Sequence, residues 1–337
     1  MQELKNQILC GDCVEVLRRA QAPFADLVFA DPPFNIGYKY DKYHDEKAHT
    51  QYLAWTRAWI GECVRLLKPQ GSIYIAIGDE YAAHIKLILE DELRLTMRNW
   101  IVWHYTFGQQ TKNKFARSHT HILYFVKDAK SFVFNDDVVR VISDRQKKYC
   151  DRRANPDGKM PDDVWNEYPR VCGTFLERTG FPCQMPESLL ARIIRASSNE
   201  GDWVLDPFCG SGTTAAVAHK LKRTYTTIDL SEAYAEAARE RIARSEGLPV
   251  EGNGSDWPEH ADAELKWLYG ENKIPVAQLC ENRPLLSLFT KKLNGRLQKK
   301  QPYTIKEVST RLNRLGSQLS PLDKTSSVRR EASSLEE

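Results

Sequence analysis

The chain has 337 residues, of which 42% are hydrophobic and 28% are charged, and its formal net charge at pH 7 is +3. This length and apolar fraction allow one large α/β core with an added small domain. The small net charge does not identify a nucleic-acid-binding protein, because such binding needs a local basic surface. The sequence contains no apolar run long enough to cross a bilayer and no signal-peptide pattern at its start, so we expect a cytoplasmic protein, or one of the bacterial nucleoid.

The strongest pattern in the chain is the alternation of short β-branched runs with longer helical periods. The expected strands are residues 7–10, 26–30, 72–77, 97–106, 121–126, 203–206 and 225–228. The expected helices are residues 51–67, 80–90, 187–197, 213–220 and 232–245. This order predicts a doubly wound, mostly parallel sheet. No helix separates 97–106 from 121–126, so these two segments are expected to form an antiparallel pair at one edge.

Composition divides the chain into five segments. Residues 1–133 and 181–248 carry the sheet pattern, and they are separated by a polar insertion, residues 134–180, that is rich in Arg, Lys, Asp and Pro. A loop of that length in a compact protein is usually functional or disordered. Residues 249–316 predict a small helical C-terminal extension. Residues 317–337 are rich in Ser and poor in aromatics, and they predict a flexible tail.

The eight cysteines are scattered along the chain and predict free thiols. Cys10 and Cys13 have the C-x-x-C spacing, but no second pair follows. A structural zinc site takes about four ligands, so no metal is expected.

A glycine-rich turn follows the expected strand 203–206 and opens the expected helix 213–220. Its sequence is Asp206-Pro207-Phe208-Cys209-Gly210-Ser211-Gly212-Thr213-Thr214. Glycines allow a tight turn and a close approach to a ligand, and the free amides of a helix start favour an anion. A glycine turn alone is weak support for a ligand site. The acid at the end of the next strand, Asp229, strengthens that interpretation because it suits ribose hydroxyls.

A second motif, Asp31-Pro32-Pro33-Phe34, stands at the end of the expected strand 26–30. A carboxylate at this end of a strand points into the crevice where α/β proteins bind ligands. Prolines stiffen the turn and remove N–H donors, so Asp31 and the Pro32 carbonyl offer two acceptors to the two hydrogens of an amino group. Phe34 offers a stacking face for a base taken out of a helix. The alternative is a Pro-Pro loop with a solvent-facing acid.

A third motif, Leu9-Cys10-Gly11-Asp12-Cys13, precedes a short helix. Asp12 suits the adenine amino group of a cofactor, and it equally suits a helix N-cap. The two interpretations are compatible.

Together these motifs resemble those of the amino-type DNA methyltransferases, in the permuted beta group where D-P-P-F/Y precedes F-x-G-x-G. The resemblance covers residues 4–245 and implies a seven-stranded methyltransferase sheet, S-adenosylmethionine as cofactor, and target recognition by the insertion 134–180. It implies an active site at Asp31, Pro32, Pro33 and Phe34. It implies cofactor contacts from Asp12, Cys13, Asp31, Gln184, Asp206, Pro207, Phe208, Gly210, Gly212, Thr213 and Asp229. Asp in the first position of D-P-P-F is the usual adenine-N6 form, whereas cytosine-N4 enzymes mostly carry Ser.

The segment before the cofactor strand departs from the family. The family often has H-P-T-Q-K-P, whereas this chain has Phe181-Pro182-Cys183-Gln184-Met185-Pro186. The same segment is similar to the nucleophile loop of cytosine-C5 methyltransferases, in which a thiolate attacks the ring. In that family the loop lies downstream of the cofactor glycines. Here Cys183 lies upstream of them, so we expect Cys183 not to be a nucleophile.

Basic residues gather in two places where DNA contact is expected. Those in the link between the two edge strands are Lys112, Lys114 and Arg117. Those in the insertion are Arg145, Lys147, Lys148, Arg152, Arg153 and Lys159, with Tyr149 and Trp165 among them. Basic groups position a phosphate backbone and aromatics stack on bases. For any single residue, a solvated loop is the alternative.

The sequence therefore predicts a site-specific DNA-methyltransferase (adenine-specific) that transfers a methyl group to N6 of a flipped adenine in double-stranded DNA, as a restriction–modification or orphan modification enzyme. Cytosine-N4 transfer and a non-catalytic DNA-binding partner with the same fold are the alternatives. A cognate restriction endonuclease and a homodimer are the further partners considered.

Overall fold

The computed structural model describes residues 2–106, 111–149, 151, 153–171, 177–247, 257–297 and 301–319. The chain divides into two compact units. The sheet unit comprises Met1–Asn135 and Asp162–Pro249, and the helical unit comprises Asp136–Pro161 and Val250–Glu337. The predicted insertion 134–180 is thus divided between the two units, because from Asp162 onward its residues belong to the sheet unit. None of the described helices is long and apolar enough to cross a membrane.

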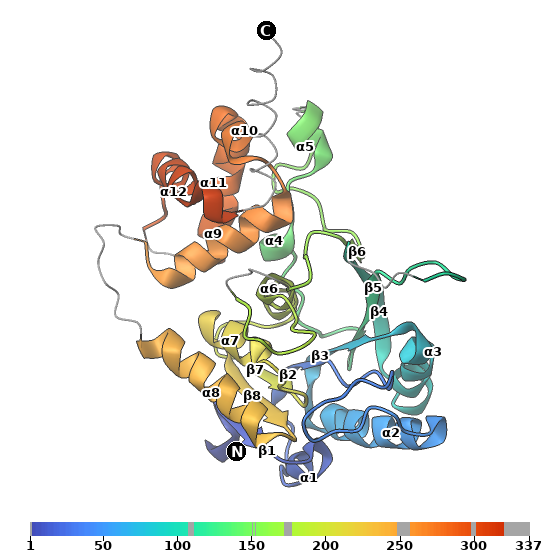
Figure 1. Ribbon diagram of the computed structural model, residues 1–337. Coiled ribbons are helices and arrows are strands. Elements are labelled where there is room, and N and C mark those ends of the chain that lie inside the picture. Colours follow the sequence, from blue (N-terminus) through green and yellow to red (C-terminus); the bar gives the residue numbers. More distant parts are fainter. Residues whose placement is uncertain are drawn as a thin grey trace. The chain divides into compact units, whose positions relative to one another are not determined.

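The sheet unit is built on one eight-stranded sheet, shown in Figure 1. Its strands are β1 (Gln7–Cys10), β2 (Ala25–Ala30), β3 (Leu67–Ile77), β4 (Thr96–His104), β5 (His119–Val126), β6 (Val164–Trp165), β7 (Trp203–Asp206) and β8 (Thr224–Asp229). The expected seven strands are all present, and the expected number was wrong by one. The additional strand, β6, pairs in parallel with β4. Two residues are too few to show the two-residue period by which a strand is recognised in a sequence.

The order of the strands is β1-β8-β7-β2-β3-β5-β4-β6. All neighbouring strands are parallel except β3 with β5 and β5 with β4. The predicted antiparallel pair near one edge is confirmed. The two strands of the C-terminal half, β7 and β8, lie between β1 and β2. The fold therefore places β7 directly beside β2, although about 170 residues separate them in the chain.

The helices of the sheet unit cover both faces of the sheet. They are α1 (Cys13–Arg18), α2 (His49–Leu66), α3 (Asp79–Leu87), α6 (Glu187–Ser197), α7 (Thr213–Lys220) and α8 (Glu232–Gly247), with a short 3-10 turn at Gln2–Leu4 and a π turn at Ile88–Glu92 after α3. The helices α1 to α3 lie on one face of the sheet, and α7 and α8 lie on the other (Figure 1). This arrangement confirms the doubly wound fold class.

The helix α2 shows why its sequence folds where it does. Tyr52, Trp59, Ile60 and Cys63 recur at helical spacing and are fully buried against the sheet. The helix ends at Leu66, and β3 begins at the next residue, five residues before the expected start of that strand. Pro69 disfavours helical backbone at the residue before it and lacks the amide that a helix needs.

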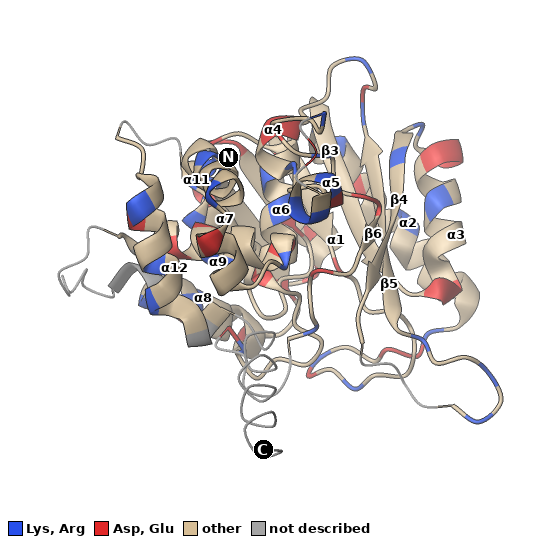
Figure 2. Cartoon of the chain, turned by 90° about the horizontal axis from the view of Figure 1, so that it is seen from above, with Lys and Arg blue, Asp and Glu red and all other residues tan. Residues whose placement is uncertain are grey.

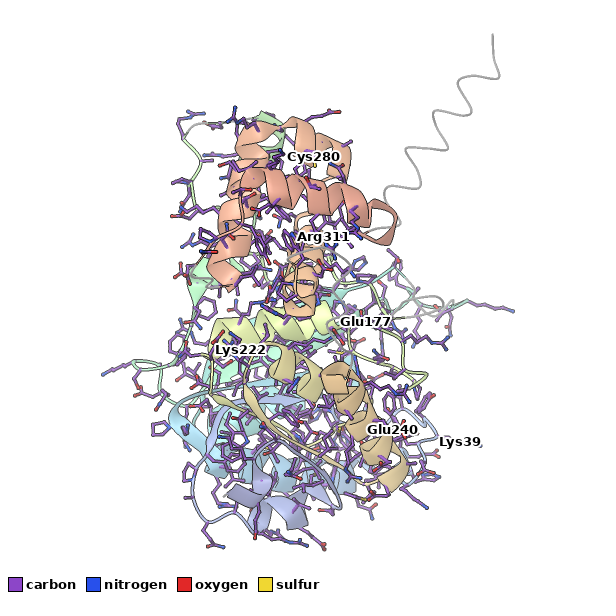
Figure 3. The ribbon with its side chains drawn as sticks, turned by 90° about the vertical axis from the view of Figure 1, so that its left-hand side faces the viewer. Lys39, Glu177, Lys222, Glu240, Cys280 and Arg311 are labelled. Carbon is purple, nitrogen blue, oxygen red and sulfur yellow. The ribbon has the colours of Figure 1, made fainter. Side chains whose placement is uncertain are left out.

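The helical unit has its own apolar core. Its helices are α4 (Asp136–Val139), α5 (Asp144–Tyr149), α9 (Glu259–Asn272), α10 (Val276–Glu281), α11 (Arg283–Leu297) and α12 (Ile305–Leu319). On α12, Val308, Leu312 and Leu315 are buried at helical spacing. Arg311 of the same helix, labelled in Figure 3, pairs with Asp262 of α9. The expected tail began too early, because residues 317–319 still belong to α12; residues 320–337 lie outside the described residues.

Candidate active site

The two principal motifs leave the sheet from neighbouring strands. Leu27 and Val28 of β2 pair with Val204 and Leu205 of β7. Asp31 and the Asp206 turn therefore emerge side by side at the carboxyl edge of the sheet. Strand order reverses at this point, which is where open α/β sheets bind their ligands.

One cavity of about 840 Å³ lies at this edge, within the sheet unit. All four residues of the Asp31 motif line it, as do Asp12, Cys13, Gln184, Asp206, Pro207, Phe208, Gly210, Thr213 and Asp229. Of the residues predicted to bind cofactor, only Gly212 is not part of the cavity wall. The volume of the cavity lies within the usual range for small-molecule sites. Residues distant in sequence are thus assembled into one site.

Hydrogen bonds within the glycine turn explain its residues. The buried carboxylate of Asp206 accepts from the backbone amide of Phe208 at 2.8 Å and from the Thr214 hydroxyl at 2.5 Å. Burial raises the pKa of Asp206 to about 8, against the effect of these two bonds. Asp206 therefore shapes the turn as well as lining the cavity.

Both glycines of the turn are required by geometry. Gly212 has a φ of +72°, and a Cβ there would lie 2.7 Å from the Cβ of Ala238. Gly210 has a φ of +50°, and its Cβ would lie 3.0 Å from the Phe181 ring. Side chains at these positions would strain the backbone and collide with their neighbours. The turn can therefore keep its shape only with glycine at these two positions.

Two further acids offer oxygens to a ligand. Asp229 accepts from the Gly210 amide at 2.8 Å and from the Ser231 amide at 2.9 Å, one bond to each oxygen. A carboxylate has about four lone-pair sites, so acceptor capacity remains for hydroxyl groups. Asp12 caps α1 through one oxygen, Oδ1, which accepts from Val14 and Glu15. The N-cap interpretation is confirmed, and the second oxygen takes no part in either bond.

The catalytic candidate, Asp31, has an unusual protonation equilibrium. Burial in the cavity wall raises its pKa from 3.8 to about 7. The turn after it is fixed by the Tyr52 hydroxyl, which donates to the Pro33 carbonyl at 2.7 Å. Such perturbed acids in a cleft mark functional sites.

The loop that follows the motif is held by the buried acid Asp45. Its carboxylate accepts from the amides of Asn35 at 2.7 Å and Ile36 at 3.0 Å. Asn35 has a φ of +58° and donates from its side chain to the Tyr81 hydroxyl at 2.9 Å. Asp45 therefore fixes the course of the chain directly beyond Phe34.

Sequence reasoning missed several residues of the cavity wall. They include Tyr40, Tyr43, Trp55, Tyr105, Arg170, Ser231 and Tyr234. The tyrosines between Gly37 and Asp45 carry the only local signal that could have found part of this set, because three aromatics in nine residues are uncommon in a solvated loop. Trp55 and Arg170 reach the cavity through the fold alone.

The loop before α6 supports the site from one side. The Gln184 amide is used within this loop, since its oxygen accepts from Thr179 at 2.9 Å and its nitrogen donates to the Glu177 carbonyl at 2.7 Å. The Glu177 carboxylate accepts from the Glu187 amide at 2.8 Å and so caps α6 (Figure 3). Gln184 therefore positions the wall, which differs from the direct cofactor contact that the family resemblance implies.

Cys183 also lines the cavity. Desolvation and then the nearby Asp31 carboxylate raise the pKa of its thiol above the usual value, although Arg170 acts in the opposite direction. A neutral thiol is a poor nucleophile. The environment of Cys183 thus favours a role in the wall of the site.

The loop between β4 and β5 contains three residues predicted to contact DNA, and Figure 2 shows basic residues along it. Lys112 and Lys114 are exposed, and neither has an ion-pair partner among the described residues. Arg117 instead pairs with Asp79 at 3.1 Å and with Glu80. Arg117 is therefore occupied within the protein.

The predicted contacts of the insertion belong mainly to the helical unit. Arg145 is exposed on α5, Lys147 donates to the Asn272 carbonyl at 2.5 Å, and Lys148 pairs with Asp144 at 3.2 Å. Arg153 pairs with Asp151 at 3.0 Å, and Arg152 lies outside the described residues. Trp165 is buried in the sheet unit, where Arg192 lies over its ring, so it is not available to stack on a base.

A cluster of Asp79, His119 and His121 stands beside the cavity with donor atoms within 4.8 Å of one another. His121 accepts a hydrogen bond at Nδ1 from the indole Nε1 of Trp100, at 2.9 Å. The indole can only donate, so the proton of the neutral imidazole lies on Nε2, which faces Asp79 at 3.0 Å. Nε2 then has no lone pair for a metal, and the cluster is better explained as a hydrogen-bonded network that also holds Arg117.

Comparison with known proteins agrees with this geometry. A family model described as DNA methylase, covering N6 and N4 enzymes, matches residues 25–240, more than half of the chain. This chain belongs to that family. The DNA methylase match includes Asp31, Asp206 and Asp229, whereas Asp12 and α9 to α12 lie outside it.

Individual relatives cover most of the same region. Type II methyltransferase M.HpaI of Haemophilus parainfluenzae is 38% identical over 71% of this chain and 74% of that protein. DNA adenine methyltransferase YhdJ of Escherichia coli K12 is 39% identical over 70% of this chain and 82% of that protein. Among solved structures, the cytosine-N4-specific PvuII DNA methyltransferase has a TM-score of 0.56 at 19% identity, covering 79% of this chain and 93% of its own, which shows a shared fold. The chain is a DNA methyltransferase.

Proposed function

We propose that this DNA methyltransferase transfers the methyl group of S-adenosylmethionine to the N6 amino group of an adenine rotated out of double-stranded DNA. The observation that carries the proposal is the position of Asp31 at the end of β2, in the same cavity as the glycine turn after β7. The adenine assignment is supported by the Asp that opens the motif and by the similarity to YhdJ, which is named a DNA adenine methyltransferase.

The residues of the glycine-turn side fit a nucleoside cofactor. The Asp229 carboxylate has acceptor capacity for two ribose hydroxyls, and the Asp12 oxygen that takes part in neither cap bond can accept from an adenine amino group. Glycine at positions 210 and 212 lets the turn pack against Phe181 and Ala238, and Gly210 itself lines the cavity. When bound, S-adenosylmethionine supplies an electrophilic methyl group on a sulfonium.

The residues of the Asp31 side suit an exocyclic amino group. In its ionised form Asp31 accepts one amino hydrogen and the Pro32 carbonyl accepts the other, which directs the nitrogen lone pair away from the ring. The amino nitrogen loses a proton as it gains the methyl group. A carboxylate whose pKa is about 7 can take that proton and release it to water near neutral pH. Phe34 lines the same cavity and offers a stacking face to the base.

The same pair of acceptors would serve the N4 amino group of cytosine, so cytosine is the second candidate. The decisive experiment incubates the protein with methyl-labelled S-adenosylmethionine and mixed-sequence double-stranded DNA, digests the DNA to nucleosides, and identifies the labelled one. We expect N6-methyladenine. N4-methylcytosine would replace the substrate assignment, and absence of label from DNA would refute the proposal in favour of a non-catalytic DNA-binding protein.

The role of Asp31 is tested by Asp31→Asn, which keeps the shape and removes the charge. We expect the variant to bind S-adenosylmethionine in equilibrium dialysis while transfer falls by at least about a hundred-fold. Asp91→Asn is the matched control, because Asp91 is exposed in the π turn after α3. Equal activity of wild type and Asp31→Asn would remove Asp31 from the chemistry.

We also propose that the enzyme acts in the bacterial cytoplasm as the modification partner of a restriction endonuclease, which the similarity to a type II methyltransferase supports. Plasmid DNA from cells expressing the protein should then resist cleavage by an endonuclease of the same recognition sequence. We further propose that the chain forms a homodimer, which sedimentation of the full chain tests.

A further inference from the structure

The loop between β4 and β5 carries a phenylalanine that is completely exposed. Phe115 is 100% accessible to solvent. Single exposed apolar residues are common on proteins, so exposure by itself assigns no role. The neighbours of Phe115 and its position relative to the cavity do carry information.

Part of this loop belongs to the cavity wall. Thr111, Lys114 and Arg117 line the cavity, whereas Phe115 does not. Arg117 is anchored to Asp79 and Glu80, and the Ser118 carbonyl accepts from the Tyr105 amide at 2.9 Å. Residues 117 and 118 are therefore anchored to the sheet unit, and the exposed Phe115 ring is not part of the cavity wall.

The charges next to Phe115 suit a phosphate backbone. Lys112 and Lys114 are exposed and have no ion-pair partner among the described residues, in contrast to Arg117. Free lysines beside an exposed aromatic combine phosphate contact with a stacking face. Lys114 also lines the cavity, so the lysines and the exposed ring stand next to the proposed base site.

Rotating a base out of a duplex leaves a gap in the stack, and some DNA-binding proteins insert apolar side chains between base steps. Given the proposed function, we propose that Phe115 inserts into the duplex at the position left by the target base, while Lys112 and Lys114 contact the flanking phosphates. Ile36 is also exposed, at 56%, but it lines the cavity and so suits the rotated base rather than the gap.

The test compares two duplexes that contain the recognition site, located beforehand by sequencing methylated DNA. In one the target base is paired normally, and in the other it faces an abasic position, which lowers the cost of rotation. Phe115→Ala should lower kcat/KM on the paired duplex by roughly ten-fold, within the range for loss of one stacking side chain. On the abasic duplex the loss should be about two-fold or less. Phe115→Trp should retain activity on both.

A fluorescent reading of base rotation gives an independent measure. With 2-aminopurine at the target position, wild type should raise the fluorescence of the paired duplex, and Phe115→Ala should raise it less. Lys114→Ala should instead lower the binding affinity for both duplexes equally, and it should reduce the slope of log affinity against log salt concentration by about one. Leu87→Ala is the apolar control, because Leu87 is 51% exposed on α3 and does not line the cavity.

Equal effects of Phe115→Ala on the two duplexes, or no effect on either, would overturn the proposal, provided that the thermal unfolding midpoint matches wild type. Failure of the proposed function is a different result, since wild type would then methylate neither duplex.

Discussion

The Tyr52 hydroxyl donates a 2.7 Å hydrogen bond to the carbonyl of Pro33, in the middle of the turn that follows Asp31. Tyr52 is fully buried, and burial raises the pKa of its hydroxyl, which therefore remains a donor at neutral pH. The bond uses the carbonyl of Pro33 and not that of Pro32, the acceptor proposed for the amino group. Tyr52 thus steadies the turn without occupying the reaction site.

Tyr52→Phe keeps the ring and removes this donor. We expect kcat to fall about ten-fold through loss of alignment, with little change in the affinity for S-adenosylmethionine, and the free energy of unfolding to fall by about 1 kcal/mol. Steady-state kinetics and urea unfolding measure these effects.

Tyr74→Phe is the matched control, because it removes a buried hydroxyl contact to Ser197 of 2.8 Å that lies outside the cavity wall. This variant should lose similar stability and keep its kcat. A Tyr52→Phe enzyme with normal kcat would show that the turn holds its alignment without the bond.

The raised pKa of Asp31 predicts the dependence of activity on pH. If the reactive form is the carboxylate, protonation below pH of about 7 removes the acceptor. We expect kcat/KM to decrease about ten-fold per pH unit on the acid side of that value and to level off above it. A profile that stays flat down to pH 5 would contradict the assigned role.

The same shift has a consequence for stability. The folded protein holds the Asp31 proton more tightly than the unfolded chain, whose ordinary value is 3.8, so the contribution of Asp31 to stability is lost as the pH rises from about 4 to 7. Asp31→Asn should therefore raise the free energy of unfolding at pH 8, on the order of 1 kcal/mol because Asp31 is only partly buried and solvent screens its charge. The gain should vanish near pH 4. Urea unfolding at the two pH values tests this sign.

Much of the site could be predicted because its residues belong to short motifs that are recognisable from their immediate neighbours in the sequence. Gly210 and Gly212 are required by their positive φ angles and therefore form a motif that is visible in the sequence. Asp31 stands at the end of a run of buried apolar residues. The sequence predicted that these two motifs lie in one site only through the family resemblance, because the order of the motifs does not by itself place β2 beside β7. In the fold, Asp31 and Gly210 line the same cavity.

The remainder could not be predicted because it depends on contacts between distant segments. The Gln184 side-chain amide forms hydrogen bonds with Glu177 and Thr179, and the Arg117 guanidinium forms ion pairs with Asp79 and Glu80. A sequence shows that these side chains can bond, but not which partner the fold brings to them. The two-residue strand β6 was not predicted for a related reason, because its pairing with β4 depends on the fold and not on a local hydrophobic period.

Gly212→Ala should damage both folding and cofactor binding. The new Cβ would meet Ala238 at 2.7 Å, and the φ of +72° is unfavourable for alanine. We expect a loss of about 2–4 kcal/mol in the free energy of unfolding and a weaker affinity for S-adenosylmethionine. Urea unfolding and equilibrium dialysis report the two effects.

Gly61→Ala is the opposite control, because Gly61 lies within α2 and a Cβ there meets nothing within 4 Å. That variant should gain about 0.5–1 kcal/mol. If Gly212→Ala were as stable as wild type, the turn would have to be adaptable in a way that its packing against Ala238 does not suggest.

Cys183→Ser separates a wall residue from a nucleophile. The pKa of the thiol is raised, so at neutral pH the sulfur is protonated, and direct transfer to an amino nitrogen requires no covalent intermediate. We expect activity within about three-fold of wild type, whereas loss of a true nucleophile costs several orders of magnitude.

N-ethylmaleimide should still inactivate the wild type, because the alkylated thiol would fill part of the cavity, and the serine variant should resist it. Bound S-adenosylmethionine should slow that inactivation if Cys183 borders the shared cavity. An inactive serine variant that folds and binds cofactor normally would instead revive thiolate chemistry, and the nucleoside assay would then have to yield 5-methylcytosine.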